Sequence, residues 1–231
     1  MDALHELAES GAPAGTTVVA DVQEAGRGSR GRTWTSPPGG LWCSVLARPV
    51  DPGIELLSLR VGLAVAAELT GIGAGRGIRV KWPNDLMLGE RKAGGVLCEA
   101  RWQGGALAWV AIGVGLNVSN APPPELAHLA TYLASVVPGL TPTALVEPVV
   151  DAIRRIDSPA GLLHSRELEA LARLDWLRGR VLEVPVAGTA DGIAADGALR
   201  VRSPDGGVTH LRAGTIVLAS SPAIPDLRPC S

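Results

Sequence analysis

A glycine- and arginine-rich segment, residues 26–34, has the composition of an anion-binding loop and reads GRGSRGRTW. Its glycines let backbone amides approach a ligand closely and permit positive φ. Its arginines offer planar donors to phosphate or carboxylate groups, and Trp34 presents a face that can stack on a base. The segment lacks the Lys-Ser/Thr ending of a Walker loop and the strand–turn–helix setting of a Rossmann motif. The pattern favours a loop for a nucleotide phosphate or an acyl phosphate over a solvated or RNA-binding linker.

Two lysines, Lys81 and Lys92, stand against nineteen arginines in this chain. An ammonium is a compact point charge and a guanidinium is a wide planar fork, so a narrow anion pocket can require the first. Asn84 and Asp85 follow Lys81 past a proline, where short polar groups project from a strand end. Asp85 carries the carboxylate that a ribose hydroxyl or Mg²⁺ needs. The alternatives are a chance survival of two lysines and an ordinary Pro-Asn-Asp turn.

Two further segments carry small residues inside expected strands. Lys92 opens residues 92–99, which read KAGGVLCE, and residues 113–118 read GVGLNV. Glycine within a strand often marks the close approach of a ligand or of another backbone. Asn117 carries an amide that can pair with an adenine edge. The alternative for the second segment is a sheet crossover without a ligand.

Periodicity and turn residues predict the elements that must position these groups. The expected helices are residues 2–10, 54–70, 141–156 and 161–177, and the expected strands are residues 16–22, 41–47, 78–81, 92–102 and 106–118. The composition changes near residue 178. Beyond it, short strands are expected at residues 181–186, 192–194, 198–201, 208–211 and 215–218, with turns that include residues 190–192. Closely spaced short strands of this kind indicate a small barrel.

The bulk composition argues against several classes of function. A chain of 231 residues can bury the core of one or two domains, and its net charge of −2 gives no drive toward nucleic acid or an anionic membrane. Cys43, Cys98 and Cys230 lie far apart without metal-ligand spacing. No basic leader and no long apolar run are visible. We therefore expect a cytoplasmic protein that binds no DNA and no membrane.

Taken together, residues 26–34, 81–85, 92–99 and 113–118 closely resemble, in order and separation, the motifs of the biotin protein ligases. The resemblance is to the monofunctional type, without an N-terminal DNA-binding domain. It implies an α+β fold: a mixed β-sheet with flanking helices, like the catalytic fold of biotin ligases and class II synthetases, plus a small C-terminal SH3-like barrel. The implied domains are residues 1–177 (catalytic), 178–221 (barrel) and 222–231 (a loose tail).

The resemblance also implies an activity. Such ligases make biotinyl-5′-AMP from biotin and MgATP, and then transfer biotin to one lysine of the biotin carboxyl carrier domain of acetyl-CoA carboxylase or a related carboxylase. ATP, Mg²⁺ and biotin are thus the expected ligands, and the expected state is a monomer or a homodimer. Two alternatives remain open: a lipoate or octanoate ligase or transferase on the same fold, and a non-enzymatic nucleic-acid-binding module.

The roles that the resemblance implies fall into two groups. The biotin group is Gln23, Gly26, Arg27, Gly28, Ser29, Lys92, Gly95, Gly113 and Gly115. The nucleotide group is Arg30, Arg32, Trp34, Lys81, Asn84, Asp85 and Asn117, with Asp85 also as the metal ligand. Lys92, Arg27 and Arg30 are the residues expected to carry catalysis, and Lys92 is expected to reach the biotin carboxylate and the α-phosphate.

Two departures from the family pattern stand out. The Ser-Thr pair that usually precedes the first helix is missing before Asp2, so we expect the true start to lie further upstream. Ser29 occupies a position where many members carry Arg. One fewer cation in the loop predicts weaker retention of the adenylate than in relatives with Arg.

Overall fold

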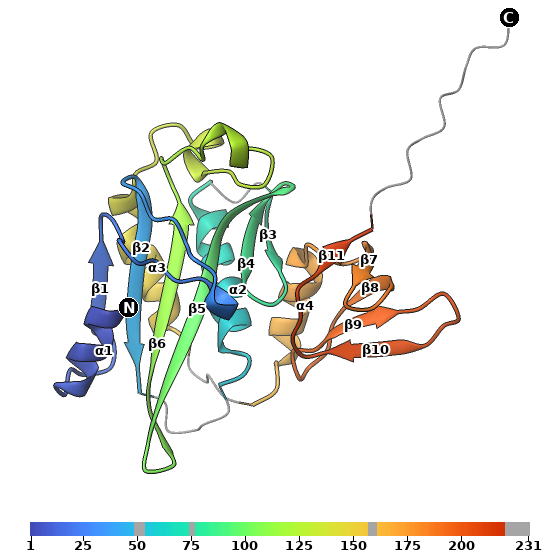
Figure 1. Cartoon of the computed structure of the whole chain (residues 1–231), viewed down its shortest axis with the longest axis horizontal. Helices are drawn as coiled ribbons and strands as arrows, with labels where there is room; N and C mark the ends of the chain where they lie inside the picture. The colour runs from blue at the N-terminus through green and yellow to red at the C-terminus, as the bar shows by residue number, and fades with distance from the viewer. Residues whose placement is uncertain (49–53, 74–76, 157–160, 220–231) are drawn as a thin grey trace, which may run out of the picture.

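The computed structural model describes residues 1–48, 54–73, 77–156 and 161–219 (Figure 1). Its larger part is a six-stranded sheet with the strand order β1-β2-β6-β5-β4-β3. The strands are β1 (Thr17–Ala20), β2 (Gly40–Ala47), β3 (Ile78–Lys81), β4 (Asp85–Leu88), β5 (Arg91–Gln103) and β6 (Ala106–Asn117). Every pair of neighbours in this sheet is antiparallel. Parallel pairing occurs in the described residues as the isolated bridges Val80–Asp175 and Lys92–Ala130.

The predicted hairpin of β5 and β6 forms the middle of the sheet and runs beyond its neighbours (Figure 1). Gly104 and Gly105 close it with φ of 57° and 82°. A two-residue turn with positive φ at both positions fits the twist of the flanking strands, and glycine adopts it without strain. The register places Gly95 opposite Gly115 and Leu97 opposite Gly113. The small residues of the two motifs therefore lie side by side.

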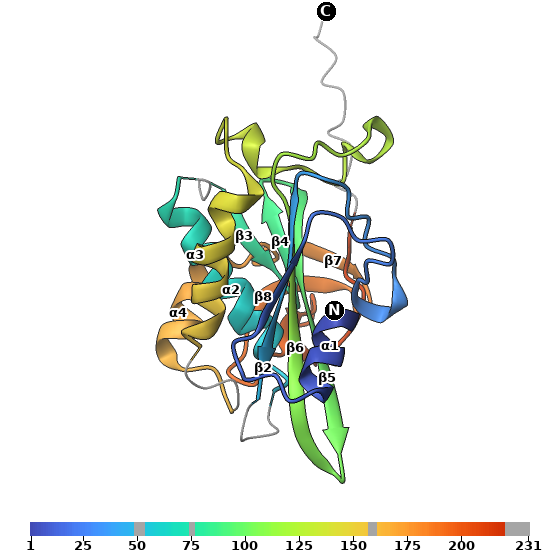
Figure 2. The same cartoon turned by 90° about the vertical axis from the view of Figure 1, so that its left-hand side faces the viewer.

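Helices cover the two faces of the sheet unequally (Figure 2). The helices are α1 (Asp2–Glu9), α2 (Leu57–Gly71), α3 (Pro142–Arg154) and α4 (Ser165–Leu174). α2 and α3 pack on one face, whereas α1 and the loop that contains residues 26–34 lie on the other. Leu57, Val61, Val65 and Leu69 recur every fourth residue along α2 and are buried, which is the stripe a core-facing helix needs. The helices are those that the sequence predicts, with shorter ends.

The C-terminal part is a five-stranded antiparallel sheet with the strand order β10-β9-β8-β7-β11. Its strands are β7 (Val181–Val184), β8 (Gly188–Ile193), β9 (Leu199–Arg202), β10 (Val208–Leu211) and β11 (Val217–Leu218). The turn predicted at residues 190–192 is wrong, because β8 runs through it. Ala190 is buried and pairs with Val201, and Gly192 with φ of 86° lies where the register shifts. A glycine inside a strand marked an irregularity here instead of a turn.

One strand of the six-stranded sheet, β4, was not predicted from the sequence. The segment after Pro83 was read as a turn, but β4 begins at Asp85 and pairs with β3 and β5. Its Leu86, Met87 and Leu88 are buried, and this short apolar run lacks the alternation that identifies a half-buried strand. Asp85 is therefore held by sheet hydrogen bonds.

One apolar core joins the two sheets, since Leu182, Leu199 and Val201 belong to the same cluster as the residues of α2 and β3–β6. Trp82 donates its indole N–H to the carbonyl of Gly197 at 2.9 Å across this junction. The SH3-like form of the C-terminal sheet and the division at residue 178 stay predictions, and the tail at residues 222–231 lies outside the described residues. No described helix combines the length and the apolar character that a membrane span requires.

Candidate active site

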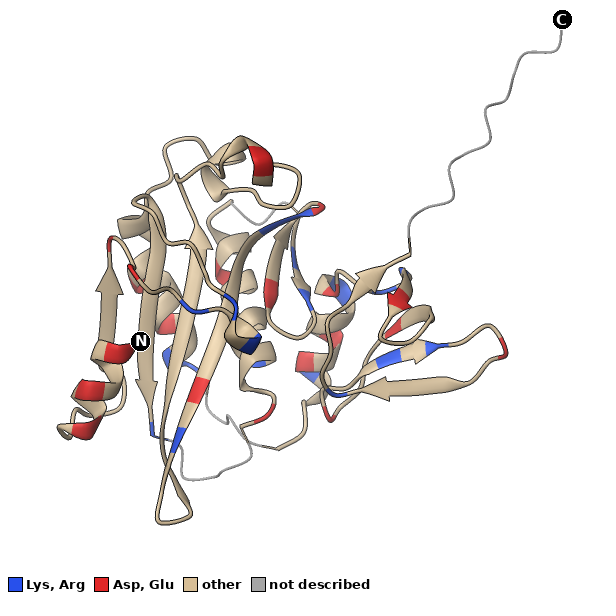
Figure 3. Cartoon of the chain, in the orientation of Figure 1, with Lys and Arg blue, Asp and Glu red and all other residues tan. Residues whose placement is uncertain are grey.

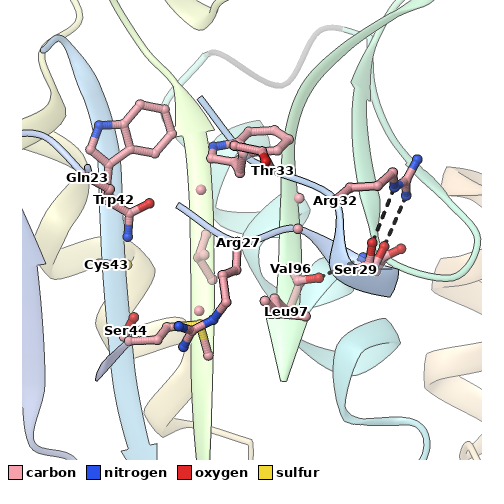
Figure 4. A pocket seen from close by; sticks show the side chains of 18 of the residues that line it. Gln23, Arg27, Ser29, Arg32, Thr33, Trp42, Cys43, Ser44, Val96 and Leu97 are labelled. Atoms are coloured by element: carbon pink, nitrogen blue, oxygen red, sulfur yellow. Dashed lines mark hydrogen bonds between the residues drawn. The ribbon is translucent and has the colours of Figure 1, made fainter. Parts of the chain in front are cut away.

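A cavity of about 250 Å³, the first cavity, lies between the loop of residues 26–34 and the strands β2, β5 and β6 (Figure 4). Nearly all of the predicted biotin group lines it: Gln23, Arg27, Gly28, Ser29, Lys92, Gly95, Gly113 and Gly115. Sequence reasoning missed several other lining residues, including Asp2, Thr33, Trp42, Ser44 and Val96. Trp42 and Ser44 lie on β2, and Cys43 between them also lines the cavity. The sequence of this strand has no polar–apolar alternation that distinguishes them.

Glycine in β6 makes room for the tryptophan that covers this cavity. A Cβ at Gly115 would lie 3.1 Å from the indole nitrogen of Trp34, closer than ordinary contact. Trp34 packs edge-on against Trp42, with ring centroids 6.4 Å apart. The indole Nε1 of Trp34 is buried and has no acceptor among the described residues. A buried donor without a partner is costly, so this N–H is available to an acceptor in the cavity.

Lys92 stands at the edge of the first cavity with its ammonium already paired. Its Nζ lies 2.6 Å from Oδ1 of Asp85 and 4.8 Å from the ring centroid of Trp34. Its backbone is fixed on both sides, because its N–H donates to Leu129 and its carbonyl accepts from Thr131. Asp85 in β4 pairs in register with Gly95 in β5, which places no side chain between the two charges. The arrangement holds one cation at a defined point beside an apolar cavity.

A second cavity of about 360 Å³ adjoins the first. The two share the lining residues Ser29, Arg32, Asn84, Val96 and Leu97. Five members of the predicted nucleotide group line the second cavity: Arg30, Arg32, Lys81, Asn84 and Asp85. Its remaining wall comes from the start of α2 and from the C-terminal sheet, with Glu55, Ser58, Asp196, Arg212 and Thr215 among the contributors. No motif in the sequence pointed to these.

The arginines of the loop are engaged within the protein. Arg30, a non-glycine residue with φ of 60°, donates to Oγ1 of Thr215 at 2.6 Å and to the carbonyl of Gly214. Arg32 folds back on Ser29, donating to its carbonyl at 3.3 Å and to its hydroxyl at 3.1 Å (Figure 4). The loop is thus tied both to itself and to the C-terminal sheet.

Arg27 forms ion pairs with two carboxylates that were not predicted from the sequence as site residues. Its Nη1 donates to Asp2 at 2.7 Å, and its Nε and Nη2 donate to the two oxygens of Glu99 at 3.0 and 3.1 Å. Burial acts to raise the pKa of Glu99, but hydrogen bonds from Arg27 and His5 outweigh it and keep that pKa below its ordinary value. Glu99 ends the segment of residues 92–99, so its position was visible although its role was not.

Lys81 lies deeper than Lys92. Burial lowers the pKa of Lys81; the Asp85 carboxylate opposes that shift, and the nearby cations of Lys92 and Arg32 add to it. Its ammonium lies 5.3 Å from the ring centroid of Trp176. Charged residues of both signs lie along the strands and loops around this region (Figure 3).

Three predicted site residues are placed differently. Asn117 lines neither cavity, and its amide is used inside the fold: it donates to Thr131 at 3.0 Å and accepts from Asn120 at 3.1 Å. Gly26 also lines neither, and a Cβ there would lie 2.2 Å from the carbonyl of Trp34, so its glycine serves the closure of the loop. Trp34 lines the first cavity instead of the second.

The structure offers limited protein ligation for a metal. Within the described ranges, no three His, Cys, Asp or Glu side chains gather closely enough to hold an ion. Asp85, Glu55 and Asp196 line the second cavity, and Asp196 is paired with Arg212. Asp85 as a single protein ligand is compatible with Mg²⁺ bound mainly through substrate phosphates and water, which usually takes one or two carboxylates from the protein. The metal role of Asp85 stays a prediction.

Comparisons with known proteins agree with the motifs. The model of the biotin/lipoate A/B protein ligase family matches residues 2–117. The bifunctional ligase/repressor BirA of Bacillus subtilis (strain 168) is 42% identical over 136 residues, which are 56% of this chain and 42% of that protein. The chain thus spans less than half of the length of that relative. The biotin–[acetyl-CoA-carboxylase] ligase of Paracoccus denitrificans is 32% identical over 212 residues, 82% of this chain and 85% of that protein.

A solved structure extends the likeness to nearly the whole fold. The biotin protein ligase from Aquifex aeolicus in complex with biotin and ATP is 26% identical, with a TM-score of 0.77 over 94% of each chain. The family model spans half of the chain, and the Paracoccus enzyme matches over most of both lengths. On these grounds, this chain belongs to the biotin/lipoate A/B protein ligase family.

Proposed function

We propose that this chain is a biotin protein ligase that uses ATP to activate biotin as biotinyl-5′-AMP and then transfers the biotinyl group to a lysine of a biotin carboxyl carrier domain. The observation that carries the proposal is the pair of adjoining cavities, which share Ser29, Arg32 and Asn84. The first cavity takes biotin and the second takes ATP. The named relatives support this assignment, since the Aquifex structure is a complex with biotin and ATP.

In the first step, a carboxylate oxygen of biotin attacks the α-phosphorus of ATP. A new P–O bond forms, and the bond to the pyrophosphate breaks. Two anions must approach each other, so fixed cations that face both are the main contribution of the protein. Arg32 lines both cavities, and Lys92 lines the first and is paired with Asp85, which lines the second. Mg²⁺ bound with ATP neutralises phosphate charge when present, and Asp85 is the residue that would hold it.

In the second step, the neutral amine of the carrier lysine attacks the acyl carbon of the adenylate. The C–N bond forms, AMP leaves with the bonding electrons, and the amine gives up a proton. This chemistry needs no side-chain nucleophile. The protein has to hold the adenylate and shield it, and Trp34, which lines the first cavity and whose indole N–H has no acceptor among the described residues, is suited to that task.

Binding of the substrates replaces hydrogen bonds and ion pairs within the protein with contacts to the substrates. Within the fold, Asp85 pairs with Lys92, Ser29 with Arg32 and Thr215 with Arg30. Each pair holds a cation in a defined position. The same pairing disfavours the nucleic-acid module, because the arginines of the loop are satisfied inside the fold and the net charge is −2.

The carrier, the oligomeric state and the location are also inferred. The name of the Paracoccus relative, a biotin–[acetyl-CoA-carboxylase] ligase, supports a carrier domain of acetyl-CoA carboxylase or a related carboxylase as the partner. From the sequence alone, we expect a monomer or a homodimer in the cytoplasm, without binding to DNA or membrane.

Exchange of labelled pyrophosphate into ATP tests the first step and distinguishes the acids. The purified protein is assayed with biotin, lipoate, octanoate or no acid, and then with a carrier domain whose mass is followed. We expect exchange with biotin alone, and mass addition on the carrier that a Lys→Arg carrier abolishes. Exchange with lipoate or octanoate in place of biotin would move the protein to the sister activity of its family. No exchange with any acid overturns the proposal.

A further inference from the structure

The geometry points to His5 in α1 as a positioning residue for Arg27 of the biotin cavity, acting through Glu99. This inference rests on the proposed function, because Arg27 matters through the ligand it faces. Four side chains from separate parts of the sequence form one hydrogen-bonded series: Arg27, Glu99, His5 and Trp109. Its inner end is buried and its outer end lines the first cavity.

The outer link is a forked ion pair. Arg27 places two nitrogens on the two oxygens of Glu99, at 3.0 and 3.1 Å, and its third nitrogen on Asp2 at 2.7 Å. A bidentate pair fixes the plane and direction of a guanidinium, which a single contact does not. Two of these three hydrogen bonds of Arg27 therefore depend on how firmly Glu99 is held.

The inner links hold Glu99 and fix the proton on His5. The indole N–H of Trp109 lies 3.0 Å from Nδ1 of His5, and Nε2 of His5 lies 2.9 Å from Oε2 of Glu99. An indole nitrogen can only donate, so Nδ1 must accept and carries no proton. The proton of the neutral ring then sits on Nε2, which donates to Glu99. The Trp109 bond thereby orients His5 as a donor toward the carboxylate.

Packing makes this series rigid. His5 is 5% exposed and Trp109 is 3% exposed, within a small apolar cluster that also contains Leu4 and Leu46. Arg48 lies over the ring of Trp109 at 5.6 Å. α1 is thus attached to the central sheet by the buried polar contacts of His5 as well as by apolar packing. A helix with a purely packing role would need no histidine at this position.

The test either removes the hydrogen-bond donor that His5 offers to Glu99 or replaces it with another donor. His5→Leu deletes both ring nitrogens, whereas His5→Gln keeps an amide N–H near the place of Nε2. We expect His5→Leu to raise the KM for biotin about tenfold, the change expected when one hydrogen bond to a charged group is lost. The KM for ATP should change little, and His5→Gln should recover most of the loss. His128→Leu, at an exposed histidine outside both cavities, is the matched control and should behave as wild type.

A second comparison separates positioning from general destabilisation. In an Arg27→Ala background, His5→Leu should raise the KM for biotin no further, although it lowers Tm in both backgrounds. An equal additional rise in that background, or an unchanged or lower KM for His5→Leu alone, overturns the inference. Failure of His5→Gln to recover activity at a wild-type Tm does so as well.

A readout without turnover keeps the inference distinct from the proposed function. In a spectrum of ¹⁵N-labelled arginine, the Nε–H of Arg27 should be protected from exchange in wild type and in His5→Gln. It should lose protection in His5→Leu. A wild-type protein that shows this pattern but no biotin-dependent exchange would refute the function and retain the positioning role. Protection that is unchanged in His5→Leu refutes the positioning role itself.

Discussion

The two cavities differ in how the chain builds them. The first is made by one loop and the strands directly beneath it, so strand register fixes its walls, with Gly95 opposite Gly115. The second is closed by residues from the other sheet, with Arg212 and Thr215 facing Lys81 from more than a hundred residues away in sequence. The walls of the first cavity are therefore fixed by local strand pairing, whereas those of the second depend on the packing of the two sheets.

The cations of the two cavities differ in the same way. Arg27 and Lys92 at the first cavity are paired with carboxylates on neighbouring elements. At the second cavity, Lys81 is half-buried with a lowered pKa, and Arg30 is held by uncharged oxygens of Gly214 and Thr215, between β10 and β11. Arg212, also at the second cavity, is paired with Asp196. Four cationic side chains line the second cavity, Arg30, Arg32, Lys81 and Arg212, whereas Arg27, Arg32 and Lys92 line the first. A triphosphate, with its many negative charges, suits the cavity with more cations.

The largest expected effect comes from Lys92, which lines the first cavity and is proposed to face the reacting atoms. Lys92→Arg keeps the charge but replaces a compact ammonium with a wide fork beside Asp85. We expect biotin-dependent pyrophosphate exchange to fall by about 10²–10³ fold, as when one contact to a developing charge is lost. Arg101→Lys, at an exposed residue of the β5–β6 hairpin, is the control. Near-normal turnover of Lys92→Arg would remove Lys92 from the chemistry.

Loss of the contact between α2 and α4 should affect stability first. Arg60 is buried in α2 and pairs with Glu167 of α4 at 2.8 Å. Glu167→Ala removes the carboxylate partner of this buried guanidinium, which also donates to the carbonyl of Leu162, and should cost about 3 kcal/mol of unfolding free energy. Chemical denaturation measures it, with Glu169→Ala on the same helix as the control. A loss below about 1 kcal/mol would show that the α2–α4 contact does not depend on this pair.

The same pair predicts a pH dependence. Burial acts to raise the pKa of Glu167, but hydrogen bonds from Arg60 and His164 outweigh it, so its pKa in the folded protein is below the ordinary value. The unfolded chain then binds the proton more readily, and the stabilisation is lost as the pH falls through the folded pKa. Unfolding free energy measured from neutral to acidic pH should therefore fall less steeply in Glu167→Gln than in wild type. Parallel curves would contradict this.

Gly115→Ala should disturb the first cavity alone. The added methyl would meet the indole of Trp34 at 3.1 Å and push it from its place over the cavity. We expect the KM for biotin to rise about tenfold, or about 1.4 kcal/mol, with the KM for ATP near wild type. Gly71→Ala, where the added methyl meets nothing within 4 Å, is the control. Equal changes in both KM values would show that the cavities are not separable.

Thr215→Val gives the smallest expected effect and addresses the second cavity alone. It removes the acceptor that holds Arg30 at 2.6 Å while keeping the size of the side chain. Loss of one such hydrogen bond predicts a rise of about fivefold in the KM for ATP, without change for biotin. Thr209→Val on the exposed β10 is the matched control. A change confined to the KM for biotin would reverse the assignment of the cavities.

Prediction from sequence succeeded where neighbours in the chain decide the structure. The helices and the β5–β6 hairpin follow from local patterns, and Thr141, where the predicted helix of residues 141–156 begins, accepts from the N–H of Ala144. It failed at β4 and β8, whose apolar or glycine-bearing segments lack a clear period. Prediction also assigned Asn117 to the nucleotide, because a side-chain amide at a strand end can bind either a ligand or other groups of the protein. Only its hydrogen-bond partners in the structure distinguish the two roles.

The sequence by itself determined the kind of chemistry: a loop of glycines and arginines, two retained lysines, and strands with glycine at the floor of a cavity. Tertiary structure alone decided which charges meet. It paired Lys92 with Asp85, gave Arg27 to Asp2 and Glu99, and brought Thr215 to Arg30. The physical reason is the separation along the sequence over which each kind of interaction acts. Backbone patterns act over a few residues, whereas an ion pair or hydrogen bond between distant residues forms only after the core has packed and fixed their positions.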